Sequence, residues 1–252
     1  MDIMQSLGHT IHRPFPPPEK KWIMQQTWSN LLFVHFPVSI NSLKEVVPRS
    51  LSIDTYTEVA WVSLVLFTIE NISFKNFRMF TLIPSFAEMN IRTYVTYKGK
   101  PGVYFISCDA GNRFVCNVVK RWYSINFYFA KNILIKKNHN NQLFFKSSRM
   151  DKNMNDQNIE ALYQPTSSVI SHAKKDTLDY FLTERYCLFS CNIKNDLFIG
   201  NIHHDQWPLQ PAYAELNTPE IQISNDVYIP VSPTKLHYVK RMDALFWNIE
   251  KL

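Results

Sequence analysis

The sequence predicts a strand-dominated α+β protein, and three observations support this fold class. Long runs of β-branched and aromatic residues recur along the 252-residue chain, a composition typical of strands. Two of these runs flank a hairpin connection at 98–102 that contains two glycines, and helical spacing is confined to three short segments. Because no internal repeat or linker divides the chain, we expect one domain over residues 1–252.

The strands of the first half have the clearest patterns. "TWSNLLFVHFPV" (27–38) reads as a strand, and "EVAWVSLVLFTIENI" (58–72) reads as a longer one. The longer run lacks polar alternation, so both of its faces should be buried. "EMNIRTYVTY" (88–97) alternates strictly and meets "GVYFISCDA" (102–110) across the hairpin connection, which predicts an antiparallel pair.

Three segments have helical patterns. The first is 39–47, with Ser39 as a plausible cap and Pro48 ending it. The second is 112–123, in which Phe114, Val118 and Trp122 form one stripe, and the third is 176–183, capped by Asp176 or Thr177. Further strands are expected at 127–137, 142–149, 184–193, 196–204, 212–216 and 235–247.

Glycine spacing excludes several common chemistries. The five glycines, at positions 8, 99, 102, 111 and 200, do not form a dinucleotide fingerprint, a P-loop or a nucleophile elbow. These motifs need glycine where the backbone must approach a phosphate or turn sharply. We therefore expect no nucleotide cofactor bound by these routes, no serine-hydrolase geometry, and no other cofactor.

Charge and cysteine usage limit the partners and the compartment. The net charge of +6 is scattered, and its densest part, 136–158, holds few aromatic residues, which favours a solvated surface over a nucleic-acid interface. No apolar run reaches the roughly 20 residues of a membrane-spanning helix, and the N-terminus does not look like a signal peptide. We expect a cytoplasmic protein whose four cysteines are reduced, and the composition leaves a homo-oligomer open.

The stretch "IHHDQWPLQPAYAE" (202–215) raises the question of a metal site. If 196–204 is a strand, His203 and His204 point to opposite faces and cannot both hold one ion. No further ligand pair of suitable spacing follows, so we expect no metal. His203 stays a weak acid–base candidate, because an unperturbed histidine titrates near neutrality.

Five separated motifs resemble the YqjF family of uncharacterised bacterial proteins. They are "RPFPPPEKKWIMQQTWSNLLFVHFPV", "LKEVVPRSLSIDTYTEVAWV", "EMNIRTYVTYKGKPGVYFISCDAGNR", "LTERYCLF" and "IHHDQWPLQPAYAE". The resemblance runs from about residue 13 to about residue 247 and places the chain in the acetoacetate decarboxylase-like superfamily. It implies a closed β-cone or barrel around a central cavity, with the few helices peripheral to it, and it implies that His204 and Trp207 form a structural corner.

The resemblance also implies which cavity groups are kept. The decarboxylases form a Schiff base on a lysine, beside an arginine and a glutamate. In this chain Ser29 stands where their arginine is, Glu88 stands where their glutamate is, and Phe127 and Tyr128 stand where their adjacent lysines are. Lys131 lies about 13 Å further along the strand, so Schiff-base chemistry is not expected.

Glu88, Asn90 and Arg92 share one face of their strand, because side chains alternate with period two. Together with the resemblance, this predicts that they line the pocket, whereas a solvated strand face is the alternative. Asn90 and Tyr104 are the nearest candidates to bond Glu88 in a regular strand. Arg185 is a further ligand-binding candidate, or it forms an ion pair with Glu184 that closes one end of the barrel.

Two functions remain open from the sequence. The first is a lyase or hydratase-like enzyme on a small carbonyl or carboxylate compound, with Glu88 as general acid or base and Arg92 as anion holder. The second is a non-catalytic binding protein, whose cavity holds a small ligand between residues such as Phe127, Tyr128 and Tyr104.

Overall fold

The computed structural model describes residues 7–75, 83–123, 125–136, 142–150, 158–192, 194–218, 220–224 and 227–252. Its strands are β1 (Met24–Val38), β2 (Ser52–Ile53), β3 (Thr55–Tyr56), β4 (Val59–Phe74), β5 (Phe86–Tyr97), β6 (Lys100–Ala110), β7 (Phe127–Lys136), β8 (Leu143–Arg149), β9 (Asn158–Pro165), β10 (Cys187–Cys191), β11 (Leu197–His203), β12 (Gln210–Leu216), β13 (Glu220–Gln222), β14 (Tyr228–Pro230), β15 (Lys235–Phe246) and β16 (Glu250–Lys251). The helices are α2 (Ile40–Lys44), α3 (Arg113–Tyr123) and α4 (Leu178–Thr183). The strand-dominated fold is therefore confirmed.

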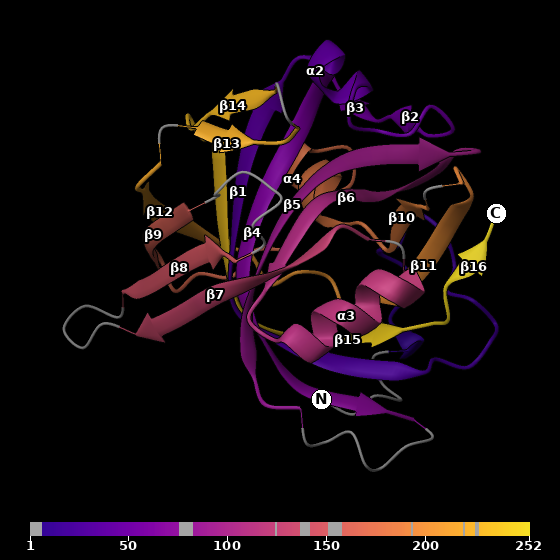
Figure 1. Ribbon diagram of the computed structural model, residues 1–252, viewed down its shortest axis with the longest axis horizontal. Helices are drawn as coiled ribbons and strands as arrows, with labels where there is room; N and C mark the ends of the chain where they lie inside the picture. Colours follow the sequence, from indigo (N-terminus) through magenta and orange to yellow (C-terminus); the bar gives the residue numbers. More distant parts are fainter. Residues whose placement is uncertain are drawn as a thin grey trace.

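Strand pairing closes the main sheet on itself in two rings that share five long strands. The shared strands are β15, β1, β4, β5 and β6, and each pairs with the next. One ring closes from β6 through β10 and β11 back to β15. The other closes from β6 through β7, β8, β9 and β12 back to β15. In Figure 1, β7, β8 and β9 lie on one side of the long strands, and β10 and β11 lie on the other.

This double closure buries both faces of the shared strands. Alternate residues of β1, β4 and β5 belong to two different apolar clusters. Leu32, Leu66 and Met89 pack with Phe145 in the first cluster, while Phe33, Val65 and Phe67 lie in the second. The uninterrupted apolar run of β4 is explained in this way.

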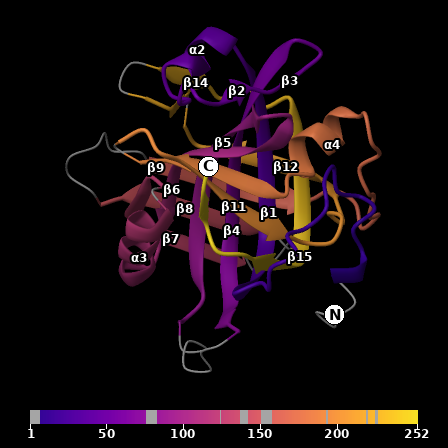
Figure 2. The same ribbon diagram turned by 90° about the vertical axis from the view of Figure 1, so that its right-hand side faces the viewer.

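The helices are shorter than the sequence suggested, but their caps and the β5–β6 hairpin agree with the expectations. Ser39 caps α2 through a hydrogen bond from Asn41 N (3.2 Å), and Thr177 rather than Asp176 caps α4. The β5–β6 hairpin turns at Lys98 and Gly99, with φ of 47° and 77°, the left-handed pair of a two-residue turn. Figure 2 shows α3 and α4 on opposite sides of the molecule.

The apolar stripe expected on the second helix is wrong at Phe114, which is 59% exposed. The side chains of Val118 and Trp122 lie outside the described residues. Val115 and Val119, four residues apart, instead face the second cluster. Five short strands and β9 were not predicted, because two or three residues carry no periodic signal and β9 follows a polar segment.

Substitution of Phe145 tests whether the first cluster holds the rings together. Phe145→Ala should lower the free energy of unfolding by about 3–5 kcal/mol, because this side chain is fully buried. Phe114→Ala is the matched control, and its effect should stay within about 0.5 kcal/mol. Urea denaturation followed by circular dichroism measures both, and equal effects would contradict the assigned core.

Candidate functional site

A cavity of about 140 Å³ lies in the second apolar cluster, between the shared strands and α3. Strands β1, β4, β5 and β6 form its main wall, and Val115 and Val119 of α3 close one side. Its surface is mostly apolar and rich in aromatic side chains, which are Trp28, Phe33, Phe67, Phe86, Phe105, Phe127, Trp207 and Phe246. A concave, apolar site with a few polar groups is the usual form of a small-molecule pocket.

Glu88 enters this cavity from β5 and is 5% exposed. Burial raises its pKa from the ordinary value of 4.5 to about 8, and the nearby charge of Asp109 adds to this effect. Asn90 acts in the opposite direction: with its amide nitrogen turned toward the carboxyl group, it donates to Glu88 Oε1 at 3.0 Å. Glu88 is therefore a neutral acid at pH 7 and can donate a hydrogen bond into the cavity.

Arg92 lines the same cavity two residues beyond Asn90. Its Nε and Nη2 atoms are buried and have no hydrogen-bond partner in the described part of the chain. The guanidinium carbon lies 5.4 Å from the centre of the Phe33 ring. Burial lowers the pKa of Arg92, and the hydroxyl of Tyr94 beside it counteracts that change. Nε and Nη2 form the edge through which arginine grips a carboxylate with two parallel bonds.

Arg185 also borders the cavity, but its guanidinium group already forms an ion pair within the protein. Its Nη1 atom lies 2.6 Å from Asp54 Oδ2, and its Nε donates to Phe181 O at 2.7 Å. The guanidinium lies over the rings of Phe181 and Tyr94. The pair that the sequence suggested with Glu184 does not form, and Arg185 instead fixes the start of β10 to the loop before β3.

A polar corner covers the far end of the cavity. Glu184 accepts hydrogen bonds from the Tyr186 hydroxyl and from Trp207 N, and burial raises its pKa to about 7. Trp207 Nε1 donates to Thr183 O at 2.9 Å, and burial lowers the pKa of His204 to about 3. His204 and Trp207 are both buried and both line the cavity, and the structural corner that the resemblance implied stays a prediction.

Three of the expected ligand-binding or acid–base residues are not among the described residues that line the cavity. Tyr104 points to the opposite face of β6 and packs against the first cluster. Tyr128 carries the guanidinium of Arg149 over its ring at 4.2 Å. His203 is fully buried, and its Nδ1 lies 3.0 Å from Arg13 Nη1. Strand alternation puts Tyr104 and Phe105 on opposite faces of β6. A bulge in the pairing of β5 with β6, between Ile91 and Arg92, shifts the register, so the pattern of the sequence alone did not show which of the two faces the cavity.

Ser29 is buried next to the cavity residue Trp28 but does not itself line the cavity among the described residues. Trp28 stacks on Trp207, with ring centres 5.8 Å apart and an angle of 13°. The sequence offered no signal for this contact, because it joins β1 to the loop before β12.

Nucleophiles and metal ligands are scarce in this part of the structure. Among the described lining residues there is no lysine. Two cysteines line the cavity, Cys108 and Cys187; both are buried, and burial raises the pKa of each above its ordinary value. All four cysteines are free.

Within the described ranges, no group of three or more His, Cys, Asp or Glu side chains could hold a metal ion. In the same ranges, no helix is long and apolar enough to cross a membrane.

Comparisons with known proteins place this chain in a family. A model of the family DUF2071, described as an uncharacterized conserved protein, matches residues 25–243. The uncharacterized protein YqjF of Bacillus subtilis (strain 168) is 37% identical over 234 residues, which cover 93% of this chain and 94% of that protein.

Solved structures with little sequence identity share the fold. The enduracididine biosynthesis enzyme MppR, complexed with pyruvate, has a TM-score of 0.68 at 10% identity, covering 94% of this chain and 91% of that one. Acetoacetate decarboxylase from Legionella pneumophila has a TM-score of 0.62 at 13% identity, covering 95% and 92%. These likenesses show an acetoacetate decarboxylase-like fold.

The raised pKa of Glu88 predicts how stability depends on pH. The folded state keeps a proton that the unfolded chain releases, so the free energy of unfolding should fall as pH rises from about 4.5 to about 8. Each unit of pKa difference contributes about 1.4 kcal/mol. Glu88→Gln should remove this part of the slope, although Glu184 keeps its own contribution. Chemical denaturation at a series of pH values measures the slope.

The control for this experiment is Glu45→Gln, at an exposed position beside α2. It should keep the wild-type dependence on pH. If Glu88→Gln and Glu45→Gln give the same slope as the wild type, Glu88 does not hold a proton in the folded protein.

Proposed function

This chain belongs to the DUF2071 family, and we propose that its cavity binds a small carbonyl compound that carries a carboxylate and promotes acid–base chemistry on it. The observation that carries this proposal is the free Nε and Nη2 edge of Arg92 inside an apolar cavity. A buried charge without a partner is costly. An anionic ligand that supplies two hydrogen bonds would offset this cost.

The chemistry of the ligand follows from the three polar groups of β5. Arg92 would hold the carboxylate, while Glu88 and Asn90 lie toward the other end of the same strand face. Glu88 and Arg92 stand four residues apart on this face, which is about 13 Å between Cα atoms. A ligand of a few carbon atoms, such as a 2- or 3-keto acid, fits a cavity of about 140 Å³.

Glu88 is the proposed acid–base group. A pKa of about 8 lies close to physiological pH, where a carboxyl group can both give and take a proton. In its neutral form it would donate to the ligand's carbonyl oxygen, and in its ionised form it would take a proton from the carbon beside the carbonyl. This is the first step of lyase and hydratase reactions that pass through an enol.

A Schiff-base route is not part of this proposal. The aromatic side chain of Phe127 lines the cavity where the resemblance puts the decarboxylase lysine, and a phenyl ring cannot form an imine. Lys131 is exposed on β7. The relative MppR was solved with pyruvate, which makes pyruvate a reasonable first probe here.

A non-catalytic binding protein is the second candidate. The predominance of aromatic walls and the lack of lysine among the described lining residues favour it. In such a protein Arg92 and Glu88 would orient a ligand that leaves unchanged. The two candidates share the binding step and differ in whether Glu88 moves a proton.

Binding is tested with Arg92 variants. Pyruvate should bind the wild type in calorimetric titration, and Arg92→Lys and Arg92→Met should bind it about 10- to 100-fold more weakly, because both lose the two-bond edge. Arg241→Met is the control, since this arginine is 54% exposed. Acetone serves as an uncharged probe whose binding should not respond to Arg92. Unchanged pyruvate affinity in both variants would contradict the proposal.

Proton exchange separates the two candidates. In D₂O, the wild type should speed the exchange of the methyl protons of pyruvate, observed by NMR, and Glu88→Gln should abolish this acceleration while still binding pyruvate. The rate should rise with pH and level off above about 8, as Glu88 becomes ionised. Tight binding without accelerated exchange would instead identify a binding protein.

A further inference from the structure

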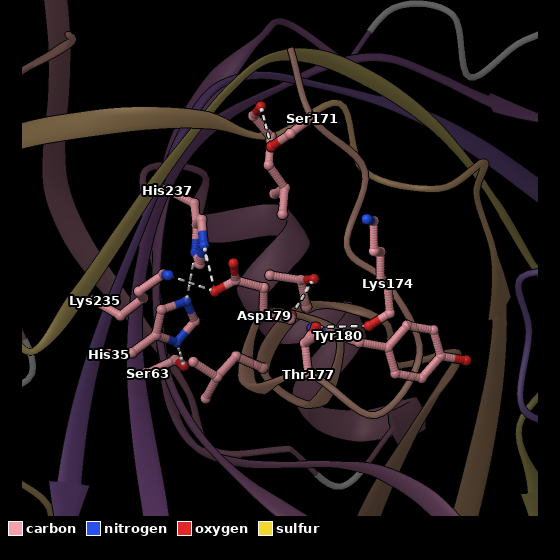
Figure 3. Close-up of polar contacts among 12 residues, drawn as sticks. His35, Ser63, Ser171, Lys174, Thr177, Asp179, Tyr180, Lys235 and His237 are labelled. Carbon is pink, nitrogen blue, oxygen red and sulfur yellow. Dashed lines mark hydrogen bonds and ion pairs between the residues drawn. The ribbon is translucent and has the colours of Figure 1, made fainter. Parts of the chain in front are cut away.

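A chain of buried polar side chains runs from the surface at α4 to the hydroxyl beside Arg92. Figure 3 shows its outer part, in which His237 and His35 lie between Asp179 and Ser63. The contacts are His237 Nε2 to Asp179 Oδ1 at 3.1 Å, His237 Nδ1 to His35 Nε2 at 3.3 Å, His35 Nδ1 to Ser63 Oγ at 2.5 Å, and Ser63 Oγ to the Tyr94 hydroxyl. Five different elements contribute one residue each.

These hydrogen-bonded side chains do not form a catalytic triad. Ser63 is fully buried, its hydroxyl lies between His35 and Tyr94, and it is not among the described residues that line the cavity. A nucleophile must reach its substrate, so another role is needed for this set of residues.

Each hydroxyl has one proton, and this fixes the direction of every bond. The Tyr94 hydroxyl lies 2.9 Å from Leu182 O, which can only accept, so Tyr94 donates there. Ser63 must then donate to the Tyr94 oxygen, and His35 Nδ1 must donate to Ser63. The Tyr94 oxygen also lies 3.2 Å from His35 Nδ1, and Arg92, two residues earlier on β5, is the cation whose charged form this hydroxyl supports.

The same reasoning assigns the two histidines. His35 is fully buried, and burial lowers its pKa well below the ordinary value, so it is neutral and its Nε2 can only accept. His237 must donate to it from Nδ1 and also to Asp179 from Nε2. A histidine that donates from both nitrogens carries a positive charge. A hydrogen bond from His237 lowers the pKa of Asp179 to about 2, which keeps the partner ionised.

We propose that Asp179 and His237 are positioning residues for Arg92, and that the charge they hold fixes the hydrogen-bond direction along the chain. The Tyr94 oxygen then presents a lone pair to the guanidinium and leaves Nε and Nη2 free for a ligand. If His237 became neutral while it still donated to Asp179, the bonds from His237 to Tyr94 would reverse, and Leu182 O would face an oxygen without a proton. The phenol, and the guanidinium beside it, would have to move. The effect on the ligand rests on the function proposed above.

The surroundings of His237 explain why Asp179 is decisive. The charged and titratable groups around it are Asp179 of α4, Lys235 of its own strand, His35 of β1, and Arg92 of β5 beyond His35. Asp179 is the sole carboxylate of this set, and the other groups are cations or a neutral ring. Lys235 Nζ contacts the same Asp179 Oδ1 at 2.9 Å but takes no part in the chain.

Asp179→Asn tests the proposal in the protein without ligand. The variant keeps an oxygen that accepts from His237 but loses the charge, and its position is 34% exposed, so folding should survive. Nitrogen-15 NMR of labelled histidine should show His237 protonated on both nitrogens and His35 protonated on Nδ1 in the wild type. In Asp179→Asn, His237 should be neutral, the proton of His35 should move to Nε2, and the Nε–H signal of Arg92 should shift.

Lys235→Gln is the matched control, because it removes the positive charge beside Asp179 and leaves all the hydrogen-bonded side chains from Asp179 to Tyr94 in place. It should leave the His35 proton on Nδ1 and the Arg92 signal in place. A singly protonated His237 in the wild type, or the same His35 tautomer in wild type and Asp179→Asn, would overturn the proposal.

A second experiment measures pyruvate binding by the same variants. Asp179→Asn should weaken its binding about fivefold or more, because Arg92 loses its fixed position, and Lys235→Gln should not. If the wild type fails to bind pyruvate, the proposed function fails while the NMR result still decides the positioning role. Equal pyruvate affinity in wild type and Asp179→Asn would contradict the link to Arg92.

Discussion

Burial of both faces of five shared strands is the constraint on which the structure depends. Because β15, β1, β4, β5 and β6 belong to two closed rings, the middle of β5 is enclosed on both faces, and Glu88 and Asn90 are only 5% and 6% exposed. Glu88 is therefore held as a neutral acid, and Arg92 keeps its charge next to an aromatic ring. The same geometry that stabilises the sheet thus sets the electrostatics of the cavity.

Two other arginines of the described structure with buried side chains pair with carboxylates, whereas the buried Arg13 contacts the Ile202 carbonyl and His203 instead. Arg149 Nη2 lies 2.6 Å from Asp109 Oδ1, and Arg185 Nη1 lies 2.6 Å from Asp54 Oδ2. For Arg92 the described contacts are a phenyl ring and one hydroxyl. Removing one partner of a buried ion pair is strongly destabilising, and a ligand carboxylate is the partner that we propose for Arg92.

The sequence predicted the strands with long patterns and the face that they bury. Alternation in 88–97 put Glu88, Asn90 and Arg92 together, and the apolar run of 58–72 indicated a strand buried on both sides. Contacts between distant segments left no such signal. The chain from Asp179 to Tyr94 joins five elements, and Phe114 is exposed because α3 turns Val115 inward. These features depend on how the rings close, which periodicity alone does not encode.

A crystal structure of the protein grown with pyruvate at neutral pH would show directly whether Arg92 holds the ligand. Both carboxylate oxygens should lie within hydrogen-bonding distance of Arg92 Nε and Nη2, with the carbonyl oxygen toward Glu88 and Asn90. Pyruvate bound elsewhere, or an Arg92 edge that pairs with a protein carboxylate while the ligand is present, would contradict this role of Arg92.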